Sequence, residues 1–121
     1  LLALRERAGV RCDLPAAVQA ARQFIDTHLN QSITVADIAA HCGKSPGRLH
    51  ALFRDTLGTT PAGYLLEQRM QRATELLIRT CLTISQIALA VGFSDQAAFT
   101  RAFRRTRGNS PSQFRQQHQT Q

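Results

Sequence analysis

The sequence contains no long hydrophobic run. Of its 121 residues, 43% are hydrophobic, yet no stretch approaches the about 18 consecutive apolar residues of a membrane span. The apolar start, LLALRERAGV, has arginines inside it and does not resemble a signal peptide. The length suits one compact domain or two very small ones, and the first residue is leucine rather than methionine. We therefore expect a piece of a longer protein that is not held in a membrane.

Motifs of metal binding and catalysis are also missing. The three cysteines, Cys12, Cys42 and Cys81, are odd in number and far apart, without CxxC or Cys/His zinc spacing. We therefore expect reduced thiols, as in a cytoplasmic protein. A metal site of His41 and Cys42 would need side chains from different helix faces. The sequence has no P-loop, no nucleotide-binding glycine fingerprint, no nucleophile elbow and no evident carboxylate pair. These absences predict no enzyme, no cofactor and no metal.

Lysine is nearly absent, and acidic residues are absent from the last part of the chain. The formal net charge is +7, and every basic residue except Lys44 is arginine, whose planar fork of donors suits phosphate and guanine. The last acidic residue is Asp95. After it come Arg101, Arg104, Arg105, Arg107 and Arg115. A polyanion is the natural partner of such an end.

The stretch from residue 82 to 108, LTISQIALAVGFSDQAAFTRAFRRTRG, predicts two helices joined by a turn. Thr83 with Gln86 forms a capping box, apolar residues follow at helical spacing, and Gly92 ends the first helix. Ser94 or Asp95 caps the second helix. Phenylalanines on one side of that helix require a core, and its other side consists of Ala97, Thr100, Arg101 and Arg104. Such a pair is either a helix-turn-helix unit, whose second helix enters the DNA major groove, or a helical hairpin with a solvated basic face.

The chain repeats this pattern between residues 33 and 58, ITVADIAAHCGKSPGRLHALFRDTLG. Gly43 matches Gly92, and Phe53 matches Phe103 once one residue is inserted in the second turn. A capping box of threonine and aspartate begins the first helix of this copy, and Ser-Pro begins its second. The outward side of that second helix would consist of Gly47, His50, Ala51 and Arg54, with Arg48 on its flank. An internal duplication favours the helix-turn-helix interpretation.

Residues 60–80, between the two copies, predict one helix of about 20 residues, roughly 30 Å long. Its apolar stripe is Leu66, Met70, Ala73 and Leu77. Consecutive major-groove segments on one face of B-DNA lie about 34 Å apart, so such a helix could present two reading helices to neighbouring turns. We expect Arg69 to hold an internal acid, Cys42 to fill an apolar position, and Tyr64 and Phe114 to pack on the first and second copies.

The sequence resembles the DNA-binding domain of the AraC/XylS family of bacterial transcription regulators over about Pro15 to Gln117. The resemblance rests on IALAVGFSDQAAFTRAFRRTRGNSP and on the pattern Y-x4-R-x3-A-x2-LL, formed by Tyr64, Arg69, Ala73, Leu76 and Leu77. It implies an all-α domain of seven helices, with two helix-turn-helix (homeodomain-like) subdomains joined by a long linker helix. It also implies a cytoplasmic, nucleoid-associated regulator. Such a regulator reads an asymmetric promoter site about two turns long, has an upstream effector or dimerisation domain, and can contact RNA polymerase.

These observations predict four segments: 1–13 as a linker from an upstream domain, 14–59 as the first subdomain, 60–80 as the linker helix and 81–121 as the second subdomain. The expected function is sequence-specific binding of double-stranded DNA through two recognition helices. The alternative is a protein-interaction module whose basic face binds an acidic partner such as RNA polymerase. Family members often carry an arginine at the position of Ala51 and a bulky residue at that of Gly47, which bears on how strongly the first helix discriminates bases.

The residues expected to contact DNA come from the two recognition helices and the turns before them. They are Ser45, Gly47, Arg48, His50, Ala51, Arg54, Ser94, Gln96, Ala97, Thr100, Arg101, Arg104 and Arg105. Arg101 is the first candidate for reading a guanine. Arg105 and Arg107 lie towards the rim, where phosphate contact or a solvated charge is expected. The helix starts at Ser45 and Ser94 are candidate phosphate sites.

Overall fold

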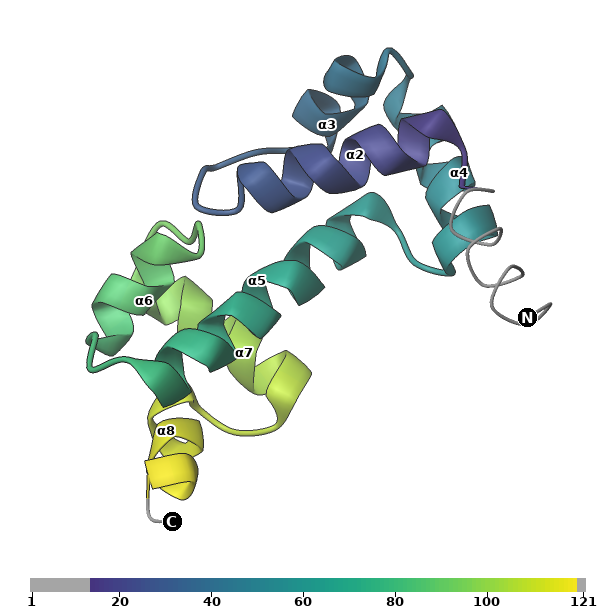
Figure 1. The fold of residues 1–121 in the computed structure, drawn as a ribbon. Helices are drawn as coiled ribbons and strands as arrows, with labels where there is room; N and C mark the ends of the chain where they lie inside the picture. Colours follow the sequence, from purple (N-terminus) through teal and green to yellow (C-terminus); the bar gives the residue numbers. More distant parts are fainter. Residues whose placement is uncertain (1–13, 120–121) are drawn as a thin grey trace, which may run out of the picture. The chain divides into compact units, whose positions relative to one another are not determined.

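The computed structural model describes residues 14–119, and within this range the chain is helical (Figure 1). The helices are α2 (Ala16–Thr27), α3 (Val35–Cys42), α4 (Pro46–Leu57), α5 (Pro61–Arg79), α6 (Ile84–Ala90), α7 (Gln96–Arg107) and α8 (Pro111–Gln119). No strand occurs in the described range. The predicted all-α fold with seven helices is confirmed. The linker expected at residues 1–13 lies outside the described residues.

The described residues divide into two compact units. The first unit contains residues 14–27 and 34–64, and the second contains residues 28–33 and 65–119. Helix α5 therefore gives its first turn to the first unit and the remainder to the second. The apolar stripe of α5 is buried against α6 and α7. The predicted boundaries at 59 and 80 stay a prediction.

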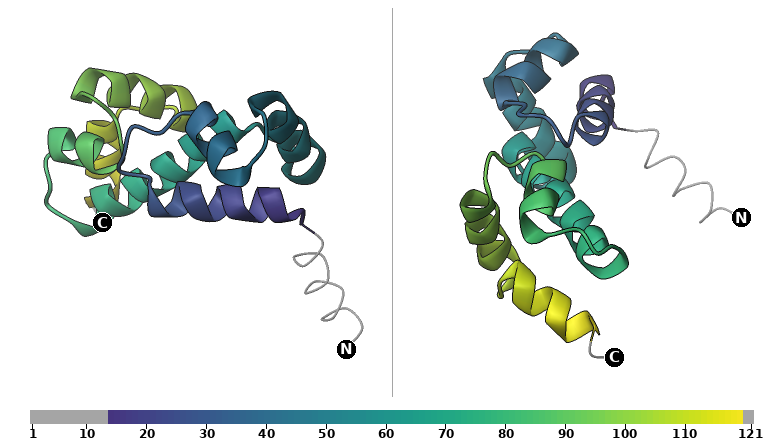
Figure 2. Two further views of the ribbon diagram at one scale, coloured as in Figure 1. Left: turned by 90° about the horizontal axis from the view of Figure 1, so that it is seen from above. Right: turned by 90° about the vertical axis from the view of Figure 1, so that its left-hand side faces the viewer.

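In the first unit, α2 packs against both α3 and α4 (Figures 1 and 2). The predicted capping box begins α3: the Asp37 amide donates to Thr34 Oγ1 at 3.1 Å, and the Thr34 amide donates to Asp37 Oδ2 at 2.9 Å. Gly43 ends α3 with a φ of +70°, which a side chain would disfavour. The Tyr64 ring meets the Phe53 ring at 5.9 Å between centroids, as expected. The buried core consists of Val18, Ala21, Ile25, Ile38, Ala39, Leu49, Phe53 and Pro61.

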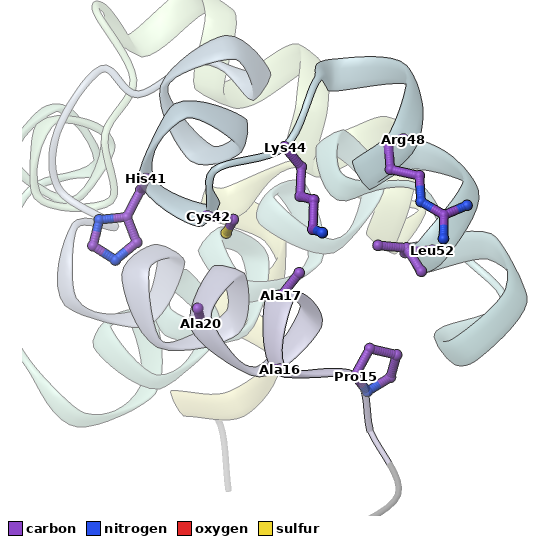
Figure 3. A pocket seen from close by; sticks show the side chains of 9 residues that line it. All are labelled: Pro15, Ala16, Ala17, Ala20, His41, Cys42, Lys44, Arg48 and Leu52. Carbon is purple, nitrogen blue, oxygen red and sulfur yellow. The ribbon is translucent and has the colours of Figure 1, made fainter.

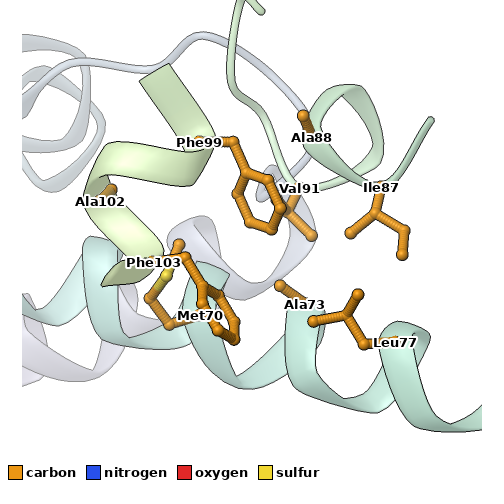
Figure 4. Packing of buried hydrophobic residues seen from close by; sticks show 9 residues of the cluster. All are labelled: Met70, Ala73, Leu77, Ile87, Ala88, Val91, Phe99, Ala102 and Phe103. Carbon is orange, nitrogen blue, oxygen red and sulfur yellow. The ribbon is translucent and has the colours of Figure 1, made fainter. Parts of the chain in front are cut away.

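The core of the second unit is a cluster of buried side chains from α5, α6, α7 and the turn between α6 and α7 (Figure 4). Figure 4 shows Met70 of α5 beside Phe103 of α7, and Leu77 of α5 below Ile87 of α6. Each buried phenylalanine contributes about 1.5–3 kcal/mol through removal of apolar surface from water. The row of aromatic rings continues past the cluster, with Phe103 to Phe114 of α8 at 5.5 Å between centroids. The expected packing of Phe114 on this unit is confirmed.

Cys42 departs from its expected place. Its side chain is half-buried at the end of α3, and burial raises the pKa of the thiol. Cys81 is exposed. Within residues 14–119 no group of three or more His, Cys, Asp or Glu side chains could hold a metal ion. Among the same residues, no helix has both the length and the apolar character needed to cross a bilayer.

Candidate nucleic-acid interface

Helix α7 buries one side and exposes the side that the sequence assigns to DNA. Phe99, Ala102 and Phe103 are buried, which fixes the rotation of the helix on the second unit. On the opposite side, Thr100 is half-buried and the remaining candidates are exposed: Gln96, Ala97, Arg101, Arg104 and Arg105. The predicted division of this helix into an inner and an outer side is therefore what the structure has.

The start of α7 is capped by Asp95 and not by Ser94. The Asp95 carboxylate accepts from the Ala98 amide at 2.7 Å, which satisfies one of the free amides of the first turn. Ser94 is exposed and precedes the cap. A carboxylate at this helix start repels a phosphate oxygen, so the anion site expected at Ser94 is weakened by its neighbour.

Two arginines of the basic C-terminal end, Arg107 and Arg115, donate to acceptors within the protein. Arg107 Nη1 and Nη2 donate to the two carboxylate oxygens of Glu67 at 3.2 and 3.1 Å, and this hydrogen bond lowers the pKa of the Glu67 carboxyl. Arg115 donates to the backbone carbonyls of residues 77, 80 and 82 at 3.0, 3.1 and 2.7 Å. The end of α5 thereby gains donors for carbonyls that a helix terminus leaves open. Arg107 is therefore paired with a carboxylate, and the donors of Arg115 are engaged by backbone carbonyls.

Three arginines of α7 remain without such partners. Within the described residues, Arg101, Arg104 and Arg105 have exposed side chains with no ion pair. Basic side chains in the last turn also suit the negative end of the helix dipole. The positive charge available on this helix is therefore concentrated on the side that faces away from the core.

Helix α4 is the counterpart in the first unit. Ser45 Oγ accepts from the Arg48 amide at 3.2 Å, Pro46 stands at the first helical position, and Leu49 and Phe53 are buried. The predicted contact residues Gly47, Arg48, His50, Ala51 and Arg54 are all exposed. A methyl group built on Gly47 would meet nothing within 4 Å. The packing of the unit therefore does not require glycine there.

Arg69 was expected to hold an internal acid, and that prediction is wrong. Its Nε donates to the Leu29 carbonyl at 3.4 Å and its Nη2 to the Gln31 carbonyl at 2.7 Å, while the guanidinium lies 5.7 Å from the centroid of the Phe93 ring. Burial lowers the pKa of this guanidinium. The acceptors are backbone oxygens of the 28–33 segment, which no side-chain pattern identifies. Arg69 thereby fixes this segment beside the turn between α6 and α7.

The chain is similar to known proteins in sequence and in structure. A family model described as a helix-turn-helix domain matches residues 38–117. The arabinose operon regulatory protein of Escherichia coli (strain K12) is 40% identical over 99 residues, which cover 81% of this chain and 34% of that protein. The chain spans about a third of the length of the curated relatives it matches.

Solved structures share the fold. The C-terminal domain of AraT, a response regulator from Geobacillus stearothermophilus, has a TM-score of 0.84 at 37% identity and covers 87% of this chain and 88% of its own. The DNA-binding domain of AdpA, a global transcriptional factor in complex with a target DNA, has a TM-score of 0.80 at 26% identity, with 86% and 93% covered. Capped helix pairs, an outward basic helix and these likenesses lead to one conclusion: the chain belongs to the AraC/XylS family of transcription regulators and has the fold of its C-terminal DNA-binding domain.

Proposed function

We propose that the chain binds double-stranded DNA sequence-specifically, with α4 and α7 reading consecutive major-groove segments of a promoter site. The observation that supports the proposal is that the arginines of the second unit fall into two groups, those held by internal acceptors and those exposed without a partner. Arg107 and Arg115 are held by internal acceptors, whereas Arg101, Arg104 and Arg105 are exposed and unpaired within the described residues. Unpaired guanidinium groups along one side of a helix suit a ligand that offers phosphates and guanine edges.

On α7, Arg101 is our candidate for base recognition, because it lies in the middle of the exposed side and a guanine can accept both arms of its fork. Arg104 follows one turn later and contacts a base or the backbone. Arg105 contacts phosphate. Gln96 can pair with an adenine near the start of the helix, and the small side chains of Ala97 and Thr100 let the helix approach the base edges and a thymine methyl.

On α4, we assign a phosphate to the start of the helix. Ser45 occupies the Arg48 amide, Pro46 has no amide hydrogen, and so the Gly47 amide is the donor left for a phosphate oxygen. Arg48 and Arg54 supply charge to the backbone, and His50 donates to a base or phosphate. Gly47 and Ala51 carry no side-chain donor, so α4 discriminates bases less than α7.

Two recognition helices that read consecutive major-groove segments need a site about 20 base pairs long, with two reading patches about 10 base pairs apart.

Selection of bound duplexes from a random pool identifies the site. The affinity of each variant for a labelled duplex of that site then tests the residues. Arg101→Gln should weaken binding to the selected site by about 1–3 kcal/mol and relax the preference for one base. Arg105→Gln should weaken binding to all sequences alike and reduce the salt slope by about 0.9. The matched controls are Arg72→Gln and Arg79→Gln, which remove exposed arginines from α5. Equal affinity of the unaltered chain for all duplexes at physiological salt would contradict the proposal.

The alternative is a protein-interaction module that binds an acidic partner, with RNA polymerase as the candidate. The observation that favours it is the same exposed, unpaired basic side of α7, since carboxylates of a protein partner can pair with these arginines as phosphates can. The double variant Arg101→Gln, Arg104→Gln separates the two functions. Loss of DNA binding with retention of polymerase binding supports DNA recognition by α7, and loss of polymerase binding alone supports the alternative.

A further inference from the structure

The first unit contains a groove that none of the proposed DNA contacts explains (Figure 3). Its volume is about 540 Å³. Small side chains from the first turns of α2 form one wall, and residues from the end of α3 and from α4 form the other. The lining residues are Pro15, Ala16, Ala17, Ala20, His41, Cys42, Lys44, Arg48 and Leu52. This space lies entirely within the first unit.

The groove is apolar inside and positively charged at its rim. Three alanines of α2 and the Leu52 side chain supply apolar surface, and the alanines leave room for another chain to approach α2 closely. Figure 3 shows Lys44 and Arg48 on the wall formed by the α3–α4 side, opposite Ala17 and Pro15. Both cationic side chains are exposed, and within the described residues neither has an ion pair. No acidic residue lines the space.

We propose that this groove is a docking site for an acidic peptide segment with aliphatic side chains, supplied by a partner protein, and that the docked peptide competes with DNA for Arg48. The aliphatic side chains fill the space between α2 and Leu52, and the carboxylates pair with Lys44 and Arg48. Charge complementarity selects this occupant, because every charged residue along the lining is basic.

The competition follows from the position of Arg48. Its side chain lines the groove, and it stands in the first turn of α4, the helix to which we assign DNA contacts. A guanidinium that holds a carboxylate of the peptide is neutralised as a phosphate contact, and the added carboxylates repel the DNA backbone. This step rests on the proposed DNA binding, whereas the docking itself does not.

Peptide binding is tested first, without DNA, on the whole chain. The probe is a fluorescent peptide of about twelve residues, long enough for about three helical turns, built from leucine and glutamate in an amphipathic pattern. A second probe replaces every glutamate by lysine. The expected result is saturable binding of the acidic probe and none of the basic one. The double variant Lys44→Gln, Arg48→Gln should weaken binding about tenfold, whereas Arg72→Gln, Arg79→Gln, which removes the same charge from α5, should leave it unchanged.

Filling the groove gives an independent check. Ala17→Phe leaves both cations in place and should abolish binding of the acidic probe, with the circular dichroism spectrum of the chain retained. Equal loss of binding in the α5 control, or full binding by Ala17→Phe, would overturn the docking site. So would nuclear Overhauser contacts, in the free chain, between residues before Leu14 and the Ala17 or Leu52 side chains, since the groove would then belong to the chain's own N-terminal segment.

The competition is tested by adding the selected duplex to the chain with bound peptide. The duplex should release the acidic probe from the unaltered chain, and a saturating probe should weaken DNA binding about tenfold. Simultaneous binding of both at unchanged affinity would overturn the shared use of Arg48. A chain that binds the probe but prefers no duplex would refute the proposed DNA recognition while leaving the docking site intact.

Discussion

Replacing Gly92 by alanine tests how the second unit is held together. Gly92 follows α6 with a φ of +94°, a conformation that costs an L-residue about 1–2 kcal/mol. An alanine methyl there would overlap the Leu29 carbonyl oxygen and lie 2.8 Å from Arg69 Nη2. One neighbour is backbone and the other is a guanidinium already held by two carbonyls. Relief of the overlap must therefore move the 28–33 segment away from Arg69.

The magnitude follows from what that movement breaks. Hydrogen bonds to a charged group contribute about 1.5–3 kcal/mol each, and loss of one of the two, added to the backbone strain, gives about 2.5–5 kcal/mol for Gly92→Ala. Gly108 offers the matched control. It ends α7 at a φ of +89°, and a methyl group there meets nothing within 4 Å. Gly108→Ala should therefore cost only the strain of about 1–2 kcal/mol.

The assay is urea unfolding monitored by circular dichroism, with the α6–α7 turn followed by amide resonances. In an Arg69→Ala background, part of the clash and both hydrogen bonds are already gone, so the added cost of Gly92→Ala should fall by at least about 1 kcal/mol. Equal destabilisation by Gly92→Ala and Gly108→Ala would refute the reasoning, because it would reduce both effects to backbone conformation alone.

The other predictions concern side chains that the fold uses. Arg107→Gln should lower the unfolding free energy by less than about 1 kcal/mol at neutral pH, because the Glu67 side chain is 46% exposed. Arg107 lowers the pKa of Glu67, so the pair stabilises the fold fully above the unfolded glutamate pKa of about 4.3. That contribution is lost as the pH falls through the lower pKa of the folded state. The unfolding free energy of Arg107→Gln should therefore change less across acidic pH than that of the unaltered chain. Arg115→Met leaves three carbonyls, in the last turn of α5 and in the segment between α5 and α6, without their donor. It should cost about 2 kcal/mol in urea unfolding, a cost absent for an exposed arginine of α7. Cys42, whose thiol pKa is raised by burial, should react with iodoacetamide more slowly than the exposed Cys81, and mass spectrometry showing equal rates would contradict the placement of Cys42.

Local signals in the sequence were sufficient for the helices and their ends. Thr83 and Gln86 form the predicted reciprocal cap, with hydrogen bonds of 2.8 and 3.0 Å, and Ser110 and Gln113 form a pair of the same kind at the start of α8. Such caps depend on residues three apart in the chain, so spacing alone identifies them. The buried side of α7 could also be predicted from the sequence, because Phe99 and Phe103 must be buried and so fix the rotation of the helix.

Partners distant in the chain were not readable. Arg107 and Glu67 are 40 residues apart, and nothing in the sequence around either residue specifies the other. Arg69 and Arg115 use backbone carbonyls, acceptors that every residue possesses and that no pattern singles out. The groove at Lys44 was missed for a related reason: its walls come from α2, α3 and α4, and the alanines that shape it resemble ordinary helix-surface residues.

The internal acceptors of these arginines, which the sequence did not identify, limit what net charge says about function. A net charge of +7 indicates a polyanion partner only to the extent that the cations are free to meet it. Here Arg69, Arg107 and Arg115 are held by internal acceptors, and they include two of the five arginines after Asp95 on which the sequence argument rested. The interpretation survives because the three that remain lie on one side of one helix. Position relative to internal acceptors, and not the total charge, therefore decides which arginines can serve a DNA interface.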